Sequence, residues 1–123
     1  MSVRVGVCGA AGRMGRTIIE VCKDTEGVEF TAAIEHNESS LLGVDAGEVA
    51  GIGKTGVLIT DNILSIADQV DVMIDFTFAA SVNANIKKCV AANCKMVIGT
   101  TGLSKIDHDQ IALASKKIAI VFA

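Results

Sequence analysis

Three glycines, Gly9, Gly12 and Gly15, have the spacing in this sequence that is most informative about chemistry. An apolar run, 3–8, precedes them, and an amphipathic run, 17–23, follows. A pyrophosphate must approach backbone N–H groups closely, and glycine leaves the space for it. The unpaired N–H groups and the dipole of the following helix add attraction for an anion. The succession of strand, glycine turn and helix therefore predicts a dinucleotide-binding turn.

Each of the three glycines has its own expected role in such a turn. Gly9 makes the tight turn out of the strand, Gly12 lets the phosphates reach the backbone, and Gly15 lets the helix pack closely on the strand. The spacing G-x-x-G-x-x-G is one residue longer at the front than the commoner G-x-G-x-x-G. The glycines alone are weak evidence, and the flanking strand and helix strengthen it.

An acidic residue, Glu35, is the second candidate for ligand binding because it follows the apolar run 28–34. In dinucleotide-binding folds a carboxylate about 20 residues beyond the glycine turn accepts hydrogen bonds from ribose hydroxyls. Such a charge-assisted hydrogen bond contributes about 1.5–3 kcal/mol. The alternative is a solvated glutamate at a strand end, and the upstream glycine turn favours the ribose role.

Strands and helices must position these residues, and the rest of the sequence predicts strands and helices in alternation. Apolar residues in 79–93 recur at helical spacing. We expect 36–56 to be mostly loop, and strands and helices to alternate over 57–59, 61–67, 72–76, 79–93, 96–98, 104 onward and 118–122. This alternation predicts an α/β fold, a Rossmann-like, doubly wound, mostly parallel sheet with helices on both faces.

Composition agrees with a single domain of this class. The chain has 123 residues, of which 50% are hydrophobic and 3% aromatic, as expected for parallel strands covered on both faces. The net charge is −3 and no basic stripe is present, so we expect no nucleic-acid partner. No apolar run is long enough to span a membrane and no signal-peptide pattern opens the chain, so we expect no membrane association and a cytoplasmic location.

Four cysteines, Cys8, Cys22, Cys89 and Cys94, lie in or beside apolar runs and form no C-x-x-C pair. A free cysteine in such surroundings behaves as a small hydrophobic residue. We therefore expect neither disulfides nor a metal site, and a reducing compartment. A redox role for Cys89 and Cys94 is the alternative.

The segment 51–55, Gly-Ile-Gly-Lys-Thr, has some features of the phosphate-binding loop of nucleoside triphosphatases. That loop requires a glycine five positions before Gly53, where Glu48 stands. No convincing strand precedes it and no helix follows, so this interpretation is rejected.

Several segments together closely resemble the N-terminal domain of the 4-hydroxy-tetrahydrodipicolinate reductase (dihydrodipicolinate reductase) family. The resemblance covers the whole chain, 1–123. It is carried by Glu35 and by the runs 7–16 (VCGAAGRMGR), 40–47 (SLLGVDAG), 53–57 (GKTGV), 74–77 (IDFT), 97–102 (VIGTTG) and 120–123 (IVFA).

The resemblance implies a reductase that uses NADH or NADPH to reduce a cyclic imine-type dicarboxylate in the diaminopimelate route to lysine. It implies a small-molecule substrate and a homotetrameric full-length protein. The glycine turn would bind the pyrophosphate. The end of the second strand would bind the adenosine ribose, and the turn after a later strand would bind the nicotinamide. The implied cofactor-binding residues are Gly9, Ala10, Ala11, Gly12, Arg13, Met14, Glu35, His36, Phe76, Thr77, Gly99, Thr100, Thr101 and Ala123. For Thr100 and Thr101 the alternative is an ordinary turn before a helix.

Two positions depart from the family pattern. Many relatives carry arginine after the cofactor-binding acid, where it would meet the 2′-phosphate of NADPH, and here the residue is His36. A histidine is only partly charged at neutral pH, so we expect use of both cofactors, with NADPH binding that weakens as pH rises. Relatives often have arginine and proline after Thr77, whereas this chain has Phe78 and Ala79, which puts a polar cofactor contact there in doubt.

Residues for proton donation and substrate binding are not expected within this chain. In the family they form a histidine pair, a lysine and a proline-containing turn. This chain has no proline, and its histidines are His36 and His108, of which His108 lies in a polar helix start. We expect the chain to be the dinucleotide-binding domain alone, inactive by itself, with the catalytic residues beyond Ala123 and an exposed apolar patch near its last strand.

Two other functions remain open. One is a stand-alone module that senses NADH or NADPH without catalysis. The other is a different oxidoreductase with the same domain, such as a homoserine or aspartate-semialdehyde dehydrogenase, which matches less well in 40–47 and 99–102.

Overall fold

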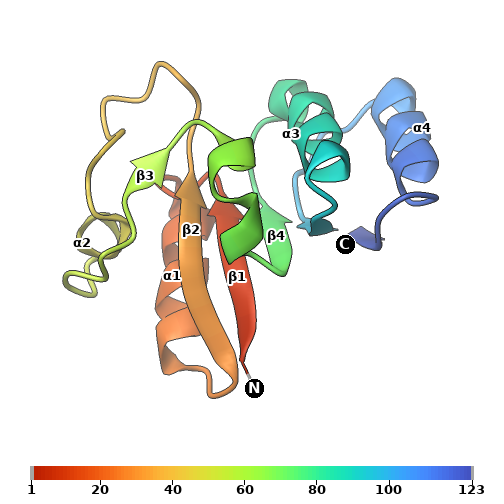
Figure 1. Ribbon diagram of the computed structural model, residues 1–123. Helices are drawn as coiled ribbons and strands as arrows, with labels where there is room; N and C mark the ends of the chain where they lie inside the picture. The colour runs from red at the N-terminus through yellow and green to blue at the C-terminus, as the bar shows by residue number, and fades with distance from the viewer. Residues whose placement is uncertain (1, 123) are drawn as a thin grey trace.

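A single parallel sheet organises the molecule. The computed structural model describes residues 2–122. Its six strands run in the order β3-β2-β1-β4-β5-β6 and every neighbouring pair is parallel (Figure 1). The strands are β1 (Val3–Cys8), β2 (Val28–Ile34), β3 (Ile59–Thr60), β4 (Val72–Asp75), β5 (Lys95–Ile98) and β6 (Ile120–Phe122). The predicted Rossmann-like α/β fold is confirmed.

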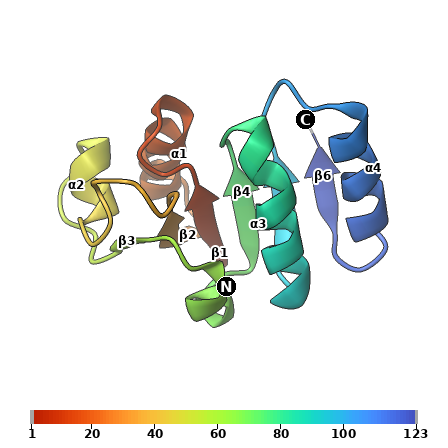
Figure 2. The same ribbon diagram turned by 90° about the horizontal axis from the view of Figure 1, so that it is seen from above.

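Helices cover the two faces of this sheet. They are α1 (Arg13–Asp24), α2 (Ala46–Ala50), α3 (Ala79–Ala91) and α4 (Lys105–Ala114), with the 3₁₀ helices η1 (Ile63–Ser65) and η2 (Ala67–Gln69). Helices α1 and α2 lie beside β1, β2 and β3, and α3 and α4 lie beside β4, β5 and β6 (Figures 1 and 2). None of the helices within residues 2–122 is long and apolar enough to cross a membrane.

Alternating strand residues divide the interior into two cores. On β1, Val7 packs in the core with α1 and α2, and the next residue, Cys8, packs in the core with α3 and α4. On β2, Ala33 and Ile34 divide in the same way. This period of two explains why the strands read as nearly continuous apolar runs, since both faces are buried.

The connections on either side of β3 differ from the prediction. The expected helix over 61–67 is wrong: Asn62 caps a 3₁₀ turn by accepting a hydrogen bond from the backbone N–H of Leu64 at 3.1 Å. Ile66 then leaves helical geometry, with φ −121° and ψ 6°, and a second 3₁₀ turn follows. The expected loop 36–56 contains the short helix α2, and the expected strand over 57–59 is replaced by β3.

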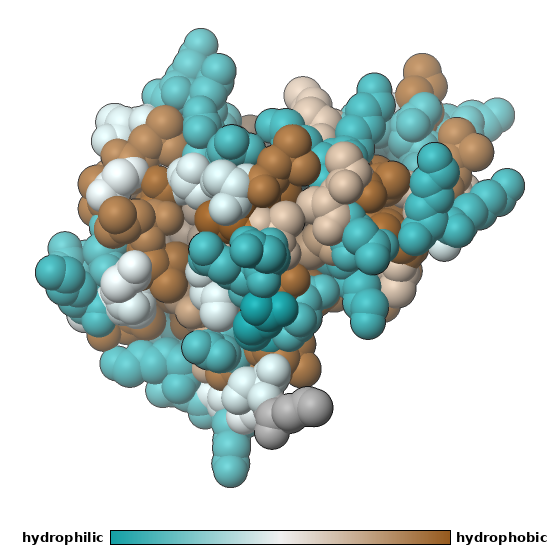
Figure 3. Space-filling model, viewed as in Figure 1, coloured by the Kyte–Doolittle hydropathy of each residue, from teal (hydrophilic) through white to brown (hydrophobic). Residues whose placement is uncertain are grey.

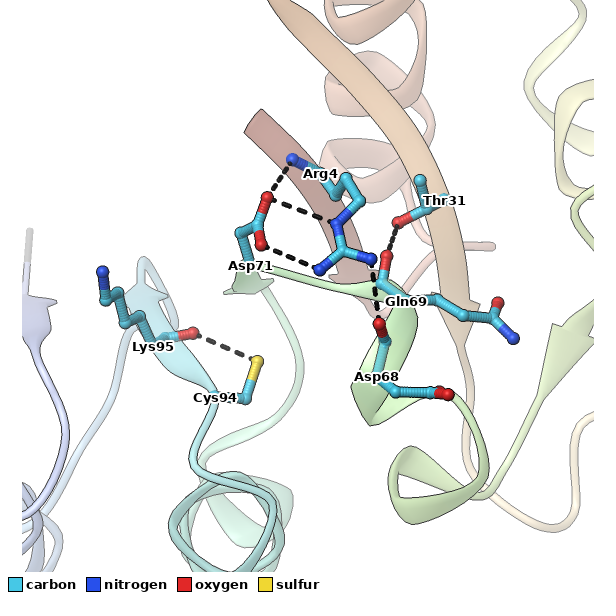
Figure 4. A network of polar contacts seen from close by, with 7 residues as sticks. All are labelled: Arg4, Thr31, Asp68, Gln69, Asp71, Cys94 and Lys95. Atoms are coloured by element: carbon cyan, nitrogen blue, oxygen red, sulfur yellow. Dashed lines mark hydrogen bonds and ion pairs between the residues drawn. The ribbon is translucent and has the colours of Figure 1, made fainter. Parts of the chain in front are cut away.

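Polar contacts fix the edge of the sheet where the strands begin (Figure 4). The guanidinium of Arg4 on β1 lies 3.0 Å from the carboxylate of Asp71, just before β4, and also donates to the carbonyl of Asp68. Hydrogen bonds from Arg4 lower the pKa of Asp71. The Thr31 hydroxyl donates to the carbonyl of Gln69 at 2.7 Å. These contacts join β1, β2 and the start of β4 at the edge opposite the strands' carboxyl ends.

The surface carries both polar and apolar side chains. Figure 3 shows hydrophobic residues gathered mainly on the side of the molecule where α2 and β3 lie. At the other end of the sheet, Val121 and Phe122 of β6 are exposed. The four cysteines are free and buried, and burial raises the pKa of Cys8 well above its usual value.

Candidate functional site

A cleft of about 1220 Å³ opens at the carboxyl ends of the strands. Loops after β1, β2, β4 and β5 line it, so it spans the point between β1 and β4 where the strand order reverses. Doubly wound sheets bind their ligands at this position. Of the predicted cofactor-binding residues, those that line the cleft are Gly9, Ala11, Gly12, Arg13, Met14, Glu35, His36, Phe76, Thr77, Gly99, Thr100 and Thr101.

Two of the predicted site residues do not line this cleft. Ala10 is fully buried beneath the turn, where it packs in the core with α1 and α2. Ala123 lies outside the described residues.

The glycine turn between β1 and α1 is held in a conformation that side chains would disrupt. Gly9 has φ +81°, a left-handed value that glycine accepts, and a Cβ there would lie 2.5 Å from the Phe76 carbonyl oxygen. The Gly9 N–H donates to the Ile34 carbonyl at 2.9 Å, which ties the turn to β2. A Cβ on Gly15 would overlap the Gly9 carbonyl, so α1 approaches the turn more closely than any other residue type allows.

Gly12 differs from the other two glycines of the turn. It is the exposed N-cap of α1, with φ −75°, a value open to every residue type. A Cβ there would lie 3.3 Å from the Gly9 carbonyl oxygen and meet nothing else within 4 Å. The fold therefore tolerates a small side chain at Gly12 better than at Gly9 or Gly15, and the absence of one leaves space above the helix N-terminus.

Glu35 bridges the end of β2 and the glycine turn. Its carboxylate accepts a hydrogen bond from the backbone N–H of Ala11 at 2.9 Å and a longer one, 3.4 Å, from its neighbour His36. The contact with Ala11 places a negative charge close to the N-terminus of α1, where the helix dipole favours it. The structure thus brings Glu35 and the turn together, a contact that sequence spacing did not predict.

His36 is exposed at the mouth of the cleft. Its Nδ1 accepts a hydrogen bond from the backbone N–H of Glu38 at 3.2 Å, so Nδ1 carries no proton in this arrangement. The imidazole therefore helps to shape the turn that follows β2. Protonation of Nδ1 would remove that hydrogen bond.

Asp75, the last residue of β4, is fully buried and organises the loops on the other side of the cleft. One oxygen accepts hydrogen bonds from the Thr77 backbone N–H at 3.0 Å, the Thr77 hydroxyl at 2.6 Å and the Thr100 hydroxyl at 3.0 Å. The other oxygen accepts from the Asn85 side chain on α3 at 2.9 Å. Asp75 therefore connects β4, α3 and the loop after β5.

No function was predicted for Asp75 from the sequence. The available signal was a carboxylate inside the apolar run 72–76, with a threonine two residues later. A charged residue in such a run requires hydrogen-bond partners, because burying it without them is costly.

The loop after β5 packs against Phe76. A Cβ on Gly99 would overlap the Phe76 ring, so glycine is needed for this close approach. The Gly99 N–H donates to the Asp75 carbonyl at 2.9 Å. Thr100 is buried, whereas Thr101 is exposed. The side chains available to a ligand at this end are thus small or hydroxylated.

Comparison with known families supports the resemblance. The family model described as "Dihydrodipicolinate reductase, N-terminus" matches residues 3–123. The chain belongs to this family. Its resemblance to the reductase's N-terminal domain, based on the glycine turn and the segments after β4 and β5, is confirmed.

Solved structures share the fold. A dipicolinate-bound dihydrodipicolinate reductase from Paenisporosarcina sp. TG-14 is 24% identical with a TM-score of 0.75, over 100% of this chain and 47% of that one. GenD2 from gentamicin A biosynthesis, in complex with NAD, is 19% identical with a TM-score of 0.77, over 99% and 34%. RSP, a Rex-family repressor, is 14% identical with a TM-score of 0.71, over 99% and 53%. This dihydrodipicolinate reductase family domain thus spans about half the length of the reductase it resembles.

Sequence reasoning missed one wall of the cleft in this family domain. That wall is formed by the residue after β3, by the residue before α3 and by one face of α3, namely Asp61, Phe78, Ala80, Ser81, Ala84, Asn85 and Lys88. The available signal was the pattern of Ala80, Ser81 and Ala84, small residues at helical spacing opposite the buried side of α3. Lys88 and Arg13 are the cations among the residues that line the cleft.

Proposed function

We propose that this chain is the nicotinamide-dinucleotide-binding domain of a reductase that transfers hydride to a cyclic imine-type dicarboxylate. The proposal includes tetrahydrodipicolinate formation in lysine and diaminopimelate biosynthesis, in a cytoplasmic, homotetrameric enzyme. Membership of the dihydrodipicolinate reductase family supports the reaction. The observation that carries the binding function is the glycine turn and Glu35, held together by the Ala11–Glu35 hydrogen bond at the cleft.

The turn supplies the groups that a pyrophosphate needs. Exposed Gly12 opens the N-terminus of α1, where unpaired N–H groups and the helix dipole attract an anion. In this proposal Gly9 to Met14 hold the pyrophosphate, with Ala10 supporting the turn from below. Glu35 accepts hydrogen bonds from the adenosine ribose.

The loop after β5 would hold the nicotinamide end. Gly99, Thr100 and Thr101 offer small and hydroxylated surfaces to the ring, while Phe76 and Thr77 complete the wall. A bound nicotinamide cofactor supplies the hydride of the reaction. The chain's own residues bind and orient it, and we place proton donation and substrate binding, together with further cofactor contacts, at Ala123 and beyond.

His36 carries the proposal on cofactor preference. A protonated imidazole would attract the 2′-phosphate of NADPH, but protonation of Nδ1 breaks the hydrogen bond from Glu38. Glu35 and Glu38 are the nearby acids, and Arg13 is a cation in the same cleft. We expect binding of both cofactors. Calorimetric titration of NADH and NADPH checks this, and binding of only one of them would contradict it.

Binding of NADH to the chain tests the proposed function directly. Gly12→Val should weaken binding strongly, because its side chain occupies the space above the helix N-terminus, where only the Gly9 carbonyl oxygen lies within 4 Å of the added Cβ. Ala112→Val, which introduces the same residue type at an exposed position of α4, is the control and should bind like the parent chain. Equal binding by Gly12→Val and the parent would refute the placement of the pyrophosphate.

A stand-alone sensor of NADH or NADPH is the second candidate. The fold shared with a Rex-family repressor shows that this architecture is not restricted to enzymes. The sequence downstream of Ala123 in the gene discriminates the two. A histidine pair and lysine motif there would favour the reductase, whereas a stop codon would favour the sensor.

A further inference from the structure

Phe78 is the most exposed of the large hydrophobic side chains in residues 2–122, at 76%. It lies at the start of α3 and lines the cleft. The chain has four phenylalanines and neither tyrosine nor tryptophan, and of the two exposed phenylalanines, Phe78 and Phe122, only Phe78 lines the cleft. Exposing a ring of this size forfeits the free energy that its burial would supply.

Phe78 is also unfavourable for the local backbone. It is the N-cap residue of α3 and provides no side-chain hydrogen bond to the helix. Serine, threonine, aspartate or asparagine would stabilise a helix at this position. Phe78 is thus neither buried nor a good N-cap residue. Such local inconsistencies are concentrated at functional sites.

The surroundings of Phe78 indicate which part of a dinucleotide meets it. Helix α3 packs against η1, which follows β3, so its cleft-lining residues lie on the same side as Asp61. Ser81 and Ala84 are small, and Ile34 lines the cleft beside Glu35. Phe78 therefore lines the same cleft as Glu35, the residue proposed to hold the adenosine ribose, and small and apolar residues are part of that lining.

We infer that Phe78 is an adenine-binding residue whose ring stacks on the face of the cofactor's base. This inference rests on the proposed function, since the adenine continues from the ribose held at Glu35. An aromatic ring binds the flat face of a base, and a stack of this kind is worth about 1–3 kcal/mol. Stacking on adenine also covers the exposed ring, which accounts for both features of position 78.

Binding of ADP-ribose, which lacks the nicotinamide, tests the inference. Phe78→Ala should weaken ADP-ribose binding by about fivefold or more, the lower end of the range for a base stack. Phe78→Trp should retain binding. Ile106→Ala is the matched control, because Ile106 is 68% exposed on α4 and does not line the cleft.

The absence of tryptophan and tyrosine makes Phe78→Trp a spectroscopic reporter. ADP-ribose should quench the fluorescence of the introduced indole, whereas oxidised nicotinamide mononucleotide, which has no adenine and does not absorb where indole emits, should not. Ile106→Trp should show no quenching by either probe. Quenching by ADP-ribose separates a stacked ring from a purely structural effect of the substitution.

The outcomes distinguish this inference from the function on which it rests. If the parent chain binds NADH and ADP-ribose, Gly12→Val does not, and Phe78→Ala binds as tightly as the parent, the inference is overturned while the proposed function stands. If Phe78→Trp is quenched by oxidised nicotinamide mononucleotide alone, the ring faces the other half of the cofactor and the inference is again overturned. If the parent chain binds neither ligand, both are overturned.

Discussion

Two buried aspartates, Asp45 and Asp75, organise two different regions of this molecule. Asp45 is the N-cap of α2, and its oxygens accept hydrogen bonds from the backbone N–H groups of Gly47, Glu48, Thr55 and Gly56. Of its partners only the Thr55 hydroxyl is a side-chain group. All of them come from the next eleven residues of the chain. Asp45 therefore closes one local loop, and it does not line the cleft.

The hydrogen-bond donors to the Asp75 carboxylate are of the opposite kind. Three of its four hydrogen-bond donors are side-chain groups, on Thr77, Asn85 and Thr100. They lie two, 10 and 25 residues away in the sequence. A carboxylate satisfied by local backbone groups stabilises a loop, whereas one satisfied by side chains of separate elements sets the distance between those elements. Asp75 is thus a positioning residue for two cleft loops.

Asp75→Asn is expected to have the largest effect. An amide N–H₂ in place of one oxygen would face a hydroxyl or amide donor and leave a buried group without an acceptor. The free energy of unfolding should fall by about 2–4 kcal/mol. NADH affinity should fall at least tenfold, because the loops after β4 and β5 lose their connection. Urea unfolding and calorimetry measure the two effects.

A double substitution that exchanges residues 75 and 85 distinguishes loss of the Asp75–Asn85 hydrogen bond from a general loss of stability. In Asp75→Asn/Asn85→Asp the introduced amide donates to the introduced carboxylate, so part of the lost stability should return. The threonines would still meet an altered group, so NADH affinity should recover less than stability. Equal stability of Asp75→Asn and the parent chain would contradict the positioning role.

Asp45→Asn is expected to lower the melting temperature without changing NADH affinity by more than about twofold, since distant sites act independently. The amide retains one acceptor oxygen but presents an N–H₂ group to the backbone N–H groups of Thr55 and Gly56. The variant should therefore loosen the segment 45–56. A thermal melt and a calorimetric titration on the same sample check both statements. A large loss of NADH affinity would show that Asp45, too, shapes the cleft.

The dependence of stability on acidic pH should also reveal the contribution of Asp45. Burial by itself would raise its pKa, but hydrogen bonds from Thr55, Gly56 and Glu48 lower the pKa from 3.8 to about 2. The pKa is lower in the folded protein than in the unfolded chain, so this stabilisation is complete above the usual carboxyl pKa. It is lost as pH falls from about 4 to about 2. Urea unfolding over that pH range should show a smaller loss of stability in Asp45→Asn than in the parent chain. An identical loss would contradict the assignment.

The distance in sequence between interacting residues explains which features of the fold could be predicted from the sequence. Strand β2 has the predicted bounds, because the apolar run 28–34 is a local signal. The glycine turn was equally recognisable, because its three glycines, the preceding strand and the following helix are consecutive in the sequence. Helix α2 was missed because five residues are too few to show a helical period. The 3₁₀ turns after β3 were missed because Asn62 and the buried Ile63 fix them through contacts that periodicity does not report.

The candidate site was predictable in part for the same reason. Motifs after β1, β2 and β5 marked most of the lining. The α3 wall and the role of Asp75 depend on which helix packs beside which loop, and only the tertiary structure shows that. Phe78 stood out in the sequence as a departure from the family pattern, but its exposure in the cleft emerged only from the fold.

A matched pair of threonines gives the smallest expected effects and the sharpest form of the comparison. The Thr100 hydroxyl donates to Asp75 and accepts from the Thr77 N–H, both at 3.0 Å. The Thr55 hydroxyl donates to Asp45 at 3.0 Å and accepts from the Val57 N–H at 3.3 Å. Valine preserves the shape of both side chains and removes only the hydroxyl. Thr100 is buried and Thr55 is exposed, so water replaces the lost bonds only at Thr55.

Thr100→Val should lower the free energy of unfolding by about 1–2 kcal/mol and weaken NADH binding several-fold, because the Thr77 N–H loses one of its two acceptors and the buried Asp75 carboxylate loses a donor. Thr55→Val should lower stability less and leave NADH affinity unchanged. Thr100→Ser keeps the hydroxyl and should behave more like the parent chain than Thr100→Val does. If the two valine variants weaken NADH binding equally, the distinction between a loop-closing and a cleft-positioning aspartate fails. If only Thr100→Val does so, the coupling of Asp75 to the cofactor runs through this hydroxyl.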